Sequence, residues 1–257
     1  MTRTALISGA GRGIGAATAR ELGRRGYHVI VNYLANKAAA QRVVADIEAD
    51  GGTAEAIQAD VTDADQVADL VGRFTTLDVL ICNANTVMPP FEPFEALSWD
   101  AFAGKINGEL AGAYHLTQRV LPLMRAQRSG RIVYVSSTAA DHVGTVMAHS
   151  IAKSALNLFS QHVAADAGRH GITVNTVAAG AVRTDATADV FNGSLLTYLS
   201  DRSVSGRILE PEDIAQVIVT LAEPGVAVTG QIVRADGGHG VLDQQLGGFA
   251  ANLGDGS

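Results

Sequence analysis

The chain has 257 residues with a formal net charge of −7, and it contains 28 glycines and one cysteine, Cys82. This acidic balance argues against a nucleic-acid or anionic-membrane partner, and a lone cysteine excludes an internal disulfide. Because no apolar run approaches the roughly 18 residues that span a bilayer and a strand-like segment begins almost at once, we expect a cytoplasmic globular protein.

Short apolar runs rich in β-branched residues alternate with longer helical stretches along the chain. Continuously apolar runs are typical of parallel strands buried on both faces. Seven runs are predicted as strands: Thr4–Ser8, His28–Tyr33, Ala54–Asp60, Asp78–Asn83, Arg131–Ser136, Ile172–Ala178 and Gln231–Ala235. The pattern predicts an α/β fold, a Rossmann-type doubly wound, seven-stranded parallel sheet flanked by helices, in a single domain over residues 1–240.

Two segments interrupt this alternation. Residues 185–206 are polar and mixed, and we interpret them as a lid over a bound substrate. Residues 241–257 form a glycine-rich tail, which would suit either a frayed terminus or a subunit contact. Between the strands, apolar residues fall on one helical face, as Leu110, Ala113, Tyr114, Thr117 and Leu121 do.

A glycine-rich turn, Ser8 to Gly15, joins the first predicted strand to the first helix. Gly9, Gly13 and Gly15 would let the backbone reverse tightly and approach a pyrophosphate, which the N–H groups of the helix start, from Arg12 through Ile14, would bind. The alternative is a turn that serves packing only, but its position between strand and helix favours a dinucleotide site.

The end of the second predicted strand indicates which dinucleotide is bound. An Asp or Glu at this place would bind the ribose 2′-hydroxyl of NAD(H) and repel a 2′-phosphate. Asn32 stands there instead, and we expect Arg12 and Lys37 to lie near the same place in the fold, which favours NADP(H). Asp60 could accept a hydrogen bond from the adenine amino group, cap the helix that follows it, or do both.

Further motifs resemble the short-chain dehydrogenase/reductase family from Thr4 to about Gly238. They are the Gly9, Gly13 and Gly15 spacing, Asp60-Val61, Cys82-Asn83-Ala84-Asn85, and Ala179-Gly180-Ala181-Val182-Arg183-Thr184. In this family such motifs bind the cofactor. The resemblance therefore implies that Val61, Asn83, Ala84, Gly180, Val182 and Thr184 contact it. The pattern is most similar to bacterial ketoacyl reductases and polyketide ketoreductases.

The catalytic motif of the family matches with one departure. The family signature is Tyr-xxx-Lys, and here His149 takes the place of the tyrosine four residues before Lys153. By the same resemblance, Asn107 would hold a proton-relay water, Ser137 would orient the substrate, and Lys153 would hold the nicotinamide ribose. The interval from Ser137 to His149 is one residue shorter than usual, so Ser136 remains an alternative, although the strand aligns without gaps to Ser137.

Three roles for His149 stay open. An imidazolium has an ordinary pKa near 6.5 and is a competent acid, which predicts a rate optimum displaced to acid pH. Lys153 and an oxidised nicotinamide would both disfavour that second charge, and imidazole is about 2 Å shorter than phenol. His149 could therefore act through water, serve as a base in non-redox chemistry, or be a relic of an active site. Tyr198, in the expected lid, could substitute.

We therefore expect an NADPH-dependent reductase of a ketone or ketoacyl substrate. The alternatives are a non-redox enzyme, such as a dehydratase or cyclase, and a silent NADP(H)-binding protein. Residue spacing suggests no metal site. The resemblance implies a homodimer or homotetramer formed through helices near residues 103–127 and 150–169. An apolar pocket that fits a hydrophobic substrate could be formed by Met88, Pro89, Pro90, Phe91, Phe94 and residues 190–199.

Overall fold

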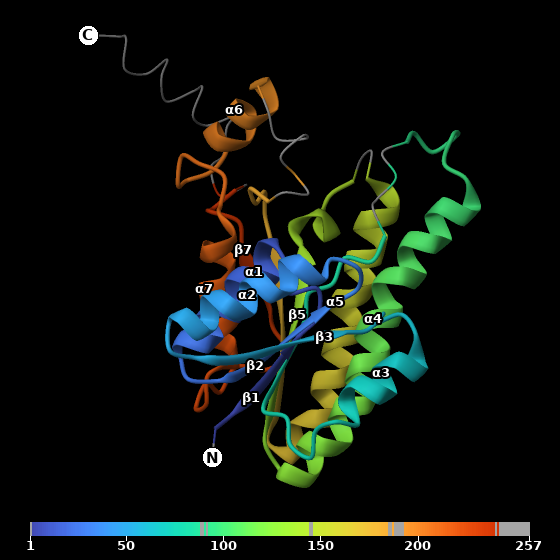
Figure 1. Ribbon diagram of the computed structural model, residues 1–257. Coiled ribbons are helices and arrows are strands. Elements are labelled where there is room, and N and C mark those ends of the chain that lie inside the picture. Colours follow the sequence, from blue (N-terminus) through green and yellow to red (C-terminus); the bar gives the residue numbers. More distant parts are fainter. Residues whose placement is uncertain are drawn as a thin grey trace.

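The computed structural model describes residues 2–87, 90, 92–143, 146–184, 187, 193–239 and 241. Its centre is a parallel sheet of seven strands in the order β3-β2-β1-β4-β5-β6-β7 (Figure 1). The strands are β1 (Thr4–Ile7), β2 (His28–Tyr33), β3 (Thr53–Gln58), β4 (Val79–Cys82), β5 (Gly130–Ser137), β6 (Ile172–Ala179) and β7 (Ile232–Ala235). All seven predicted strands are present, which confirms the Rossmann-type fold.

Helices cover both faces of the sheet. One face carries α1 (Gly13–Arg24), α2 (Lys37–Ala49) and α7 (Pro211–Ala222), and the other carries α3 (Ala64–Val71), α4 (Trp99–Gln127) and α5 (Met147–Ala167) (Figure 1). Each layer encloses its own apolar core. Because the strands are buried on both sides, their runs are continuously apolar rather than alternating.

Polar side chains determine where the helices begin. Asn36, Asp63 and Ser98 each accept a hydrogen bond from a backbone N–H in the first turn of α2, α3 and α4. The expectation that Asp60 caps the third helix is wrong, because Asp63 holds that position. Asp60 instead closes the preceding turn by accepting hydrogen bonds from the N–H and hydroxyl of Thr62.

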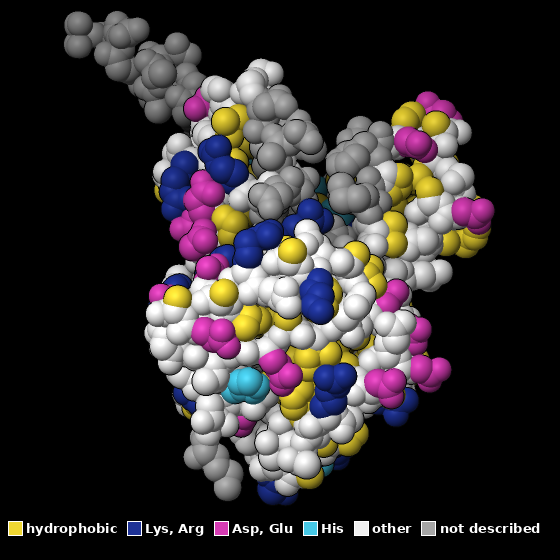
Figure 2. Space-filling view, viewed as in Figure 1, with side chains coloured by type: hydrophobic (Ala, Val, Ile, Leu, Met, Phe, Trp, Pro, Cys, Tyr) yellow, Lys and Arg dark blue, Asp and Glu magenta, His cyan; other side chains and the backbone are white. Residues whose placement is uncertain are grey.

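The order of the strands reverses between β1 and β4, whose carboxyl ends therefore leave a crevice between them. Helix α6 (Gly193–Asp201) stands above this edge, on the opposite side from the beginning of α4 (Figure 1). Figure 2 shows a notch between these two parts, with Lys or Arg side chains along its floor. Of the expected lid, residues 185–206, the structure describes residue 187 and residues 193–206, and α6 makes up the larger part of the latter.

Candidate active site

The glycine-rich turn is tied to the neighbouring strand β4 through Ser8. Its hydroxyl oxygen accepts hydrogen bonds from the backbone N–H groups of Asn83, at 2.9 Å, and Ala84, at 3.0 Å. The side-chain amide of Asn83 donates in return to the carbonyls of Ser8 and Gly9. Asn83 and Ala84, expected at the cofactor, therefore also position the turn that would bind it.

Close packing explains the glycines of this turn. Gly9 and Gly13 have positive φ angles of 63° and 55°, which favour glycine. A Cβ on Gly15 would lie 2.5 Å from the side-chain nitrogen of Asn83 and 2.6 Å from the carbonyl oxygen of Gly9. No side chain fits at that position without moving the backbone, so the turn keeps its backbone accessible.

The beginning of α1 has the properties of an anion site. Arg12 occupies the N-cap position, and its side chain makes no capping hydrogen bond. The N–H groups of the first turn, including that of Ile14, therefore point out of the helix at its positive end. A methyl carbon of Thr184 lies 3.5 Å from the position of a Cβ on Gly13, so the segment after β6 forms the other wall. This arrangement fits a pyrophosphate.

The side of the crevice next to β2 differs partly from expectation. Asn32 is 2% exposed, and its side chain donates to the carbonyls of Ala59 and Ile57, at 3.0 and 3.4 Å. Its side-chain oxygen Oδ1 accepts from the N–H of Gly9 at 3.4 Å. Since these bonds hold it within the sheet, Asn32 is not placed to bind a ribose. Asp60 is half-buried, and Val61 is buried against α4.

Arg12 and Lys37 are both exposed beside this turn. A Cβ on Gly11 would lie 3.5 Å from the backbone nitrogen of Ala40, so the glycine turn packs on the first turns of α2. Lys37 is the first residue of α2, and Arg12 directly precedes α1. Two exposed cations therefore stand at the beginnings of the two helices that adjoin the glycine turn.

Beyond the sheet centre, the segment that follows β6 is closely packed. A Cβ on Gly180 would lie 2.7 Å from the Cα of Asp236, and the Gly180 N–H donates to the Ala235 carbonyl. Val182 is buried and pairs with Leu209. These contacts fix the direction in which the chain leaves β6 toward Thr184 and the start of α1.

The two candidate serines at the end of β5 have different environments. Ser136 is 3% exposed, and its hydroxyl donates to the carbonyl of Lys153 at 3.5 Å. Ser137 is half-buried, and its hydroxyl accepts from the N–H of Ala139 at 3.1 Å in the short helix that follows. Of the two, Ser137 is the more accessible to a substrate.

Lys153 belongs to a buried ionic cluster that the sequence analysis missed. Its ammonium donates to the carboxylate of Glu109 and to the carbonyl of Val135, the latter at 2.9 Å. The second carboxylate oxygen of Glu109 accepts from Lys105 at 2.9 Å. Lys105, Glu109 and Lys153 are 0%, 5% and 6% exposed. One carboxylate thus bridges two ammonium groups, one from α4 and one from α5.

Asn107 does not take part in this cluster. Successive helical residues are rotated by about 100°, so positions 107 and 109 lie on nearly opposite faces of α4. Asn107 is exposed and lines an apolar hollow with Tyr114 and Phe159 on the outer surface of α4 and α5. The role expected for Asn107 beside Lys153 is therefore not supported, and Glu109 occupies that place.

The ionic cluster determines the charge of the neighbouring groups. Burial, together with the ammonium groups of Lys153 and Lys105, lowers the pKa of His149 to about 4, so the imidazole is neutral at pH 7. Burial alone would raise the pKa of Glu109, but Lys153 and Lys105 hold it below its usual value. Among the described residues, Nδ1 of His149 is buried without a hydrogen-bond partner. A substrate hydroxyl or a water would fit that nitrogen.

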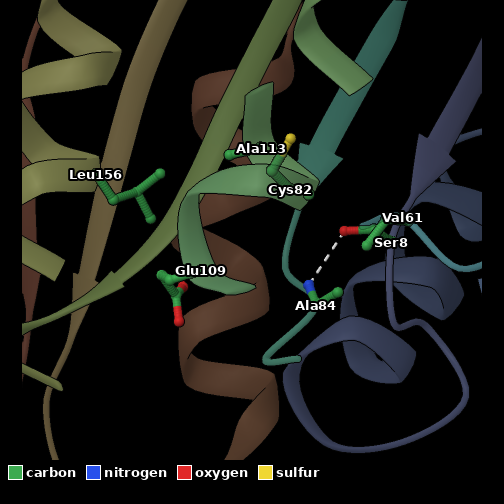
Figure 3. A pocket seen from close by; sticks show the side chains of 8 residues that line it. Ser8, Val61, Cys82, Ala84, Glu109, Ala113 and Leu156 are labelled. Atoms are coloured by element: carbon green, nitrogen blue, oxygen red, sulfur yellow. Dashed lines mark hydrogen bonds between the residues drawn. The ribbon is translucent and has the colours of Figure 1, made fainter. Parts of the chain in front are cut away.

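A small cavity of about 10 Å³ lies between the ionic cluster and the glycine turn (Figure 3). Ser8 and Ala84 line it from the side of the turn, and Glu109 lines it from α4. The glycine turn and the bridging carboxylate of the cluster therefore line the same cavity. Across the described residues, no group of three His, Cys, Asp or Glu side chains could hold a metal ion.

Much of the expected substrate pocket lies outside the described residues, namely Met88, Pro89, Phe91 and residues 190–192. Phe94 is 75% exposed. Tyr198, on α6, is 53% exposed and stacks against Arg202, whose guanidinium carbon lies 4.6 Å from the ring centroid. As described, Tyr198 faces solvent rather than His149. No helix within the described ranges is long and apolar enough to cross a bilayer.

Comparison with known proteins agrees with this geometry. Residues 9–240 match the family model described as enoyl-(acyl carrier protein) reductase. The chain is 36% identical over 92% of its length to a 3-oxoacyl-[acyl-carrier-protein] reductase from Synechocystis, covering 96% of that protein. It is 35% identical over 92% of its length to a versicolorin reductase of Emericella nidulans, covering 95% of that relative.

Solved structures show the same fold. A 7α-hydroxysteroid dehydrogenase in complex with NADH and a 7-oxo bile acid superposes with a TM-score of 0.87 at 30% identity, over 92% of this chain and 94% of that one. A gluconate 5-dehydrogenase from Burkholderia cenocepacia, in complex with NADP, gives 0.86 at 26% identity, over 93% and 96%. The chain belongs to the short-chain dehydrogenase/reductase family.

Proposed function

We propose that this protein is an NADP(H)-dependent oxidoreductase that reduces ketone or ketoacyl-type substrates, including polyketide-like ones. The observation that carries the proposal is the small cavity that the glycine turn and Glu109 line together, because Glu109 in turn binds Lys105 and Lys153. Glu109 thus links this cavity to Lys153, the lysine that would hold the nicotinamide ribose, while the glycine turn would bind the phosphates. A bound reduced nicotinamide would supply the hydride.

The charges near β2 support NADP(H) rather than NAD(H). Asn32 is held within the sheet, and no carboxylate replaces it at the end of that strand. The exposed Arg12 and Lys37, at the starts of the two helices next to the glycine turn, would stabilise the 2′-phosphate of NADP(H). An Arg12→Ala/Lys37→Ala variant should lose affinity for NADPH by at least about tenfold and keep its affinity for NADH, as measured by nicotinamide fluorescence.

Within this proposal, Ser137 orients the substrate carbonyl and Lys153 holds the ribose. His149 stands at the position of the family tyrosine. With a pKa of about 4 it is neutral between pH 5 and 8, so it cannot store the proton as imidazolium. Instead it passes a proton from the Lys153 side to the substrate, directly or through a water. The acid-displaced optimum expected from the sequence is therefore replaced by a profile with no limb near pH 6.5.

The test is NADPH oxidation at 340 nm with a broad panel of ketones. Wild type should reduce at least one of them, and His149→Ala should be slower by about 100-fold or more. His162→Ala, a change at an exposed histidine of the same helix, is the matched control and should keep full activity. Failure of wild type to oxidise NADPH with every ketone would contradict the proposal.

The neutral imidazole favours a second candidate. A histidine with an unpartnered, unprotonated nitrogen can serve as the base of a non-redox reaction, such as dehydration or cyclisation. Such an enzyme would consume substrate without a change in nicotinamide absorbance. A wild type that is silent toward ketones, with a His149→Tyr variant that reduces them, would favour this candidate over a reductase.

We further propose a cytoplasmic homodimer or homotetramer assembled through the outer face of α4 and α5. Tyr114, Ile151 and Leu158 are 48%, 43% and 58% exposed there, around the apolar hollow that contains Asn107. Apolar patches of this kind commonly mark interfaces. Light scattering coupled to gel filtration should give a mass of two or four chains, and Leu158→Glu should reduce it.

A further inference from the structure

The Glu109 bridge extends beyond the catalytic lysine toward solvent. Besides the carboxylate of Glu109, Lys105 donates to the side-chain oxygen of Asn85 at 2.6 Å and to the carbonyl of Val87 at 2.9 Å. Asn85 is exposed, whereas Lys105 is completely buried. An unbroken series of hydrogen bonds therefore runs from Lys153 through Glu109 and Lys105 to a side chain at the surface.

The use of lysine in this cluster is specific. The chain contains only three lysines against sixteen arginines, and two of the three are bound to Glu109. An arginine would suit a purely structural ion pair, because its planar group binds carboxylates through two hydrogen bonds. Unlike arginine, lysine can release its proton in a protein, and burial lowers the pKa of Lys105.

Water cannot easily replace this series of side chains. The cavity beside Glu109 measures about 10 Å³, which holds roughly one water molecule and not a file of them. The carboxylate already accepts one ammonium on each of its two oxygens. A proton that passes between the two lysines would therefore pass through Glu109 itself.

We propose that Lys105 and Glu109 form a side-chain proton relay that resupplies Lys153, in place of a chain of waters. This rests on the proposed reductase function. When the carbonyl gains a hydride, its oxygen takes one proton from Lys153 by way of His149. Lys105 then gives a proton to the Glu109 carboxylate, and the carboxyl group turns to deliver that proton to the neutral Lys153 amine. A water that enters beside Asn85 returns a proton to Lys105. One proton leaves solvent for each alcohol formed.

Lysine variants separate proton transfer from structural support. Lys105→Met fills the buried volume without an ionisable group, and Lys105→Arg keeps the charge but cannot release a proton. A relay predicts that both variants lower kcat by at least about 100-fold while the Kd for NADPH stays within about twofold. Ethylammonium should rescue a Lys105→Ala variant. Arg73→Met, a change at an exposed cation, is the control.

A spectroscopic measurement tests the bridge without any substrate. In protein labelled with ¹⁵N at the lysine side chains, only three resonances are expected. Those of Lys105 and Lys153 should be protected from hydrogen exchange, whereas the exposed Lys37 should exchange rapidly. Glu109→Gln should abolish the protection of Lys105, and Glu48→Gln, on the exposed face of α2, should leave it unchanged.

The outcomes distinguish the relay from the function on which it rests. A wild type inactive toward every ketone would overturn the reductase proposal and the relay with it. An active wild type whose Lys105→Met and Lys105→Arg variants keep kcat within about threefold would overturn the relay alone. Loss of activity in Lys105→Met with full retention in Lys105→Arg would also overturn it, because charge would then suffice.

Discussion

The two halves of the candidate site are built in different ways. In the glycine turn between β1 and α1, backbone N–H groups form the expected binding surface, and glycines stand where a side chain would clash with the neighbouring backbone. Between α4 and α5, three charged side chains are buried together, and their function depends on their ionisation. The first half depends on shape and the second on charge, so different perturbations should break them.

The largest effect is expected from loss of the bridging carboxylate. Glu109→Ala leaves two buried ammonium groups without their partner, which should lower the free energy of unfolding by about 3–5 kcal/mol. Urea denaturation at pH 7.5 measures this, with the exposed Glu48→Ala as the control. A loss below about 1 kcal/mol would mean that the ionic cluster contributes little to folding.

The glycine turn should respond to an added methyl group. Gly15→Ala brings a Cβ against the carbonyl of Gly9, so the turn must shift; we expect about 1–3 kcal/mol of destabilisation and much weaker NADPH binding. The matched control is Gly104→Ala in α4, where no heavy atom lies within 4 Å of the added Cβ. That change should instead stabilise the helix by about 0.5–1 kcal/mol. Equal NADPH binding in wild type and Gly15→Ala would refute this tight packing.

The buried histidine should make stability depend on pH. Because the pKa of His149 falls from 6.5 to about 4 on folding, the unfolded chain binds the extra proton first. Between pH 7.5 and pH 5, the free energy of unfolding should therefore fall by about 2 kcal/mol more in wild type than in His149→Phe. The exposed His162→Phe variant should follow wild type. Identical slopes for wild type and His149→Phe would show that His149 is not buried as a neutral group.

The smallest effect is expected at Asn107. Since this side chain is exposed and turned away from Lys153, Asn107→Ala should change the free energy of unfolding by less than about 0.5 kcal/mol. Its kcat and NADPH affinity should stay near those of wild type, in contrast to the Glu109 variants. A 100-fold loss of kcat in Asn107→Ala would restore this residue to the proton path.

The difference between the two regions also explains what could be predicted from the sequence. The glycine turn and all seven strands depend on residues close together in the chain, so the sequence alone predicts them well. The ionic cluster joins Lys105 and Glu109 to Lys153, more than forty residues further on, and only the packing of α4 on α5 reveals it.

A signal for the cluster was nevertheless present. Continued backwards by helical spacing, the buried stripe of Val120, Leu116 and Ala113 leads to Glu109 and then to Lys105. Charged residues in phase with an apolar stripe indicate a buried ion pair. Asn107, two residues before Glu109, lies on the other face of the helix and outside this pattern. Tyr114, predicted to lie on the apolar face, is instead 48% exposed, because it lies on the outer face of α4 together with Asn107.

The most direct test of a reductase with a neutral histidine is the dependence of single-turnover NADPH oxidation on pH, measured between 5 and 8 with the best ketone. If Lys153 supplies the proton through an uncharged His149, the rate should show no acid limb with an apparent pKa near 6.5, and His149→Ala should be at least about 100-fold slower throughout. A rate that rises toward acid pH through such a limb, and that loses it in His149→Ala, would contradict this mechanism and make the imidazolium the proton donor.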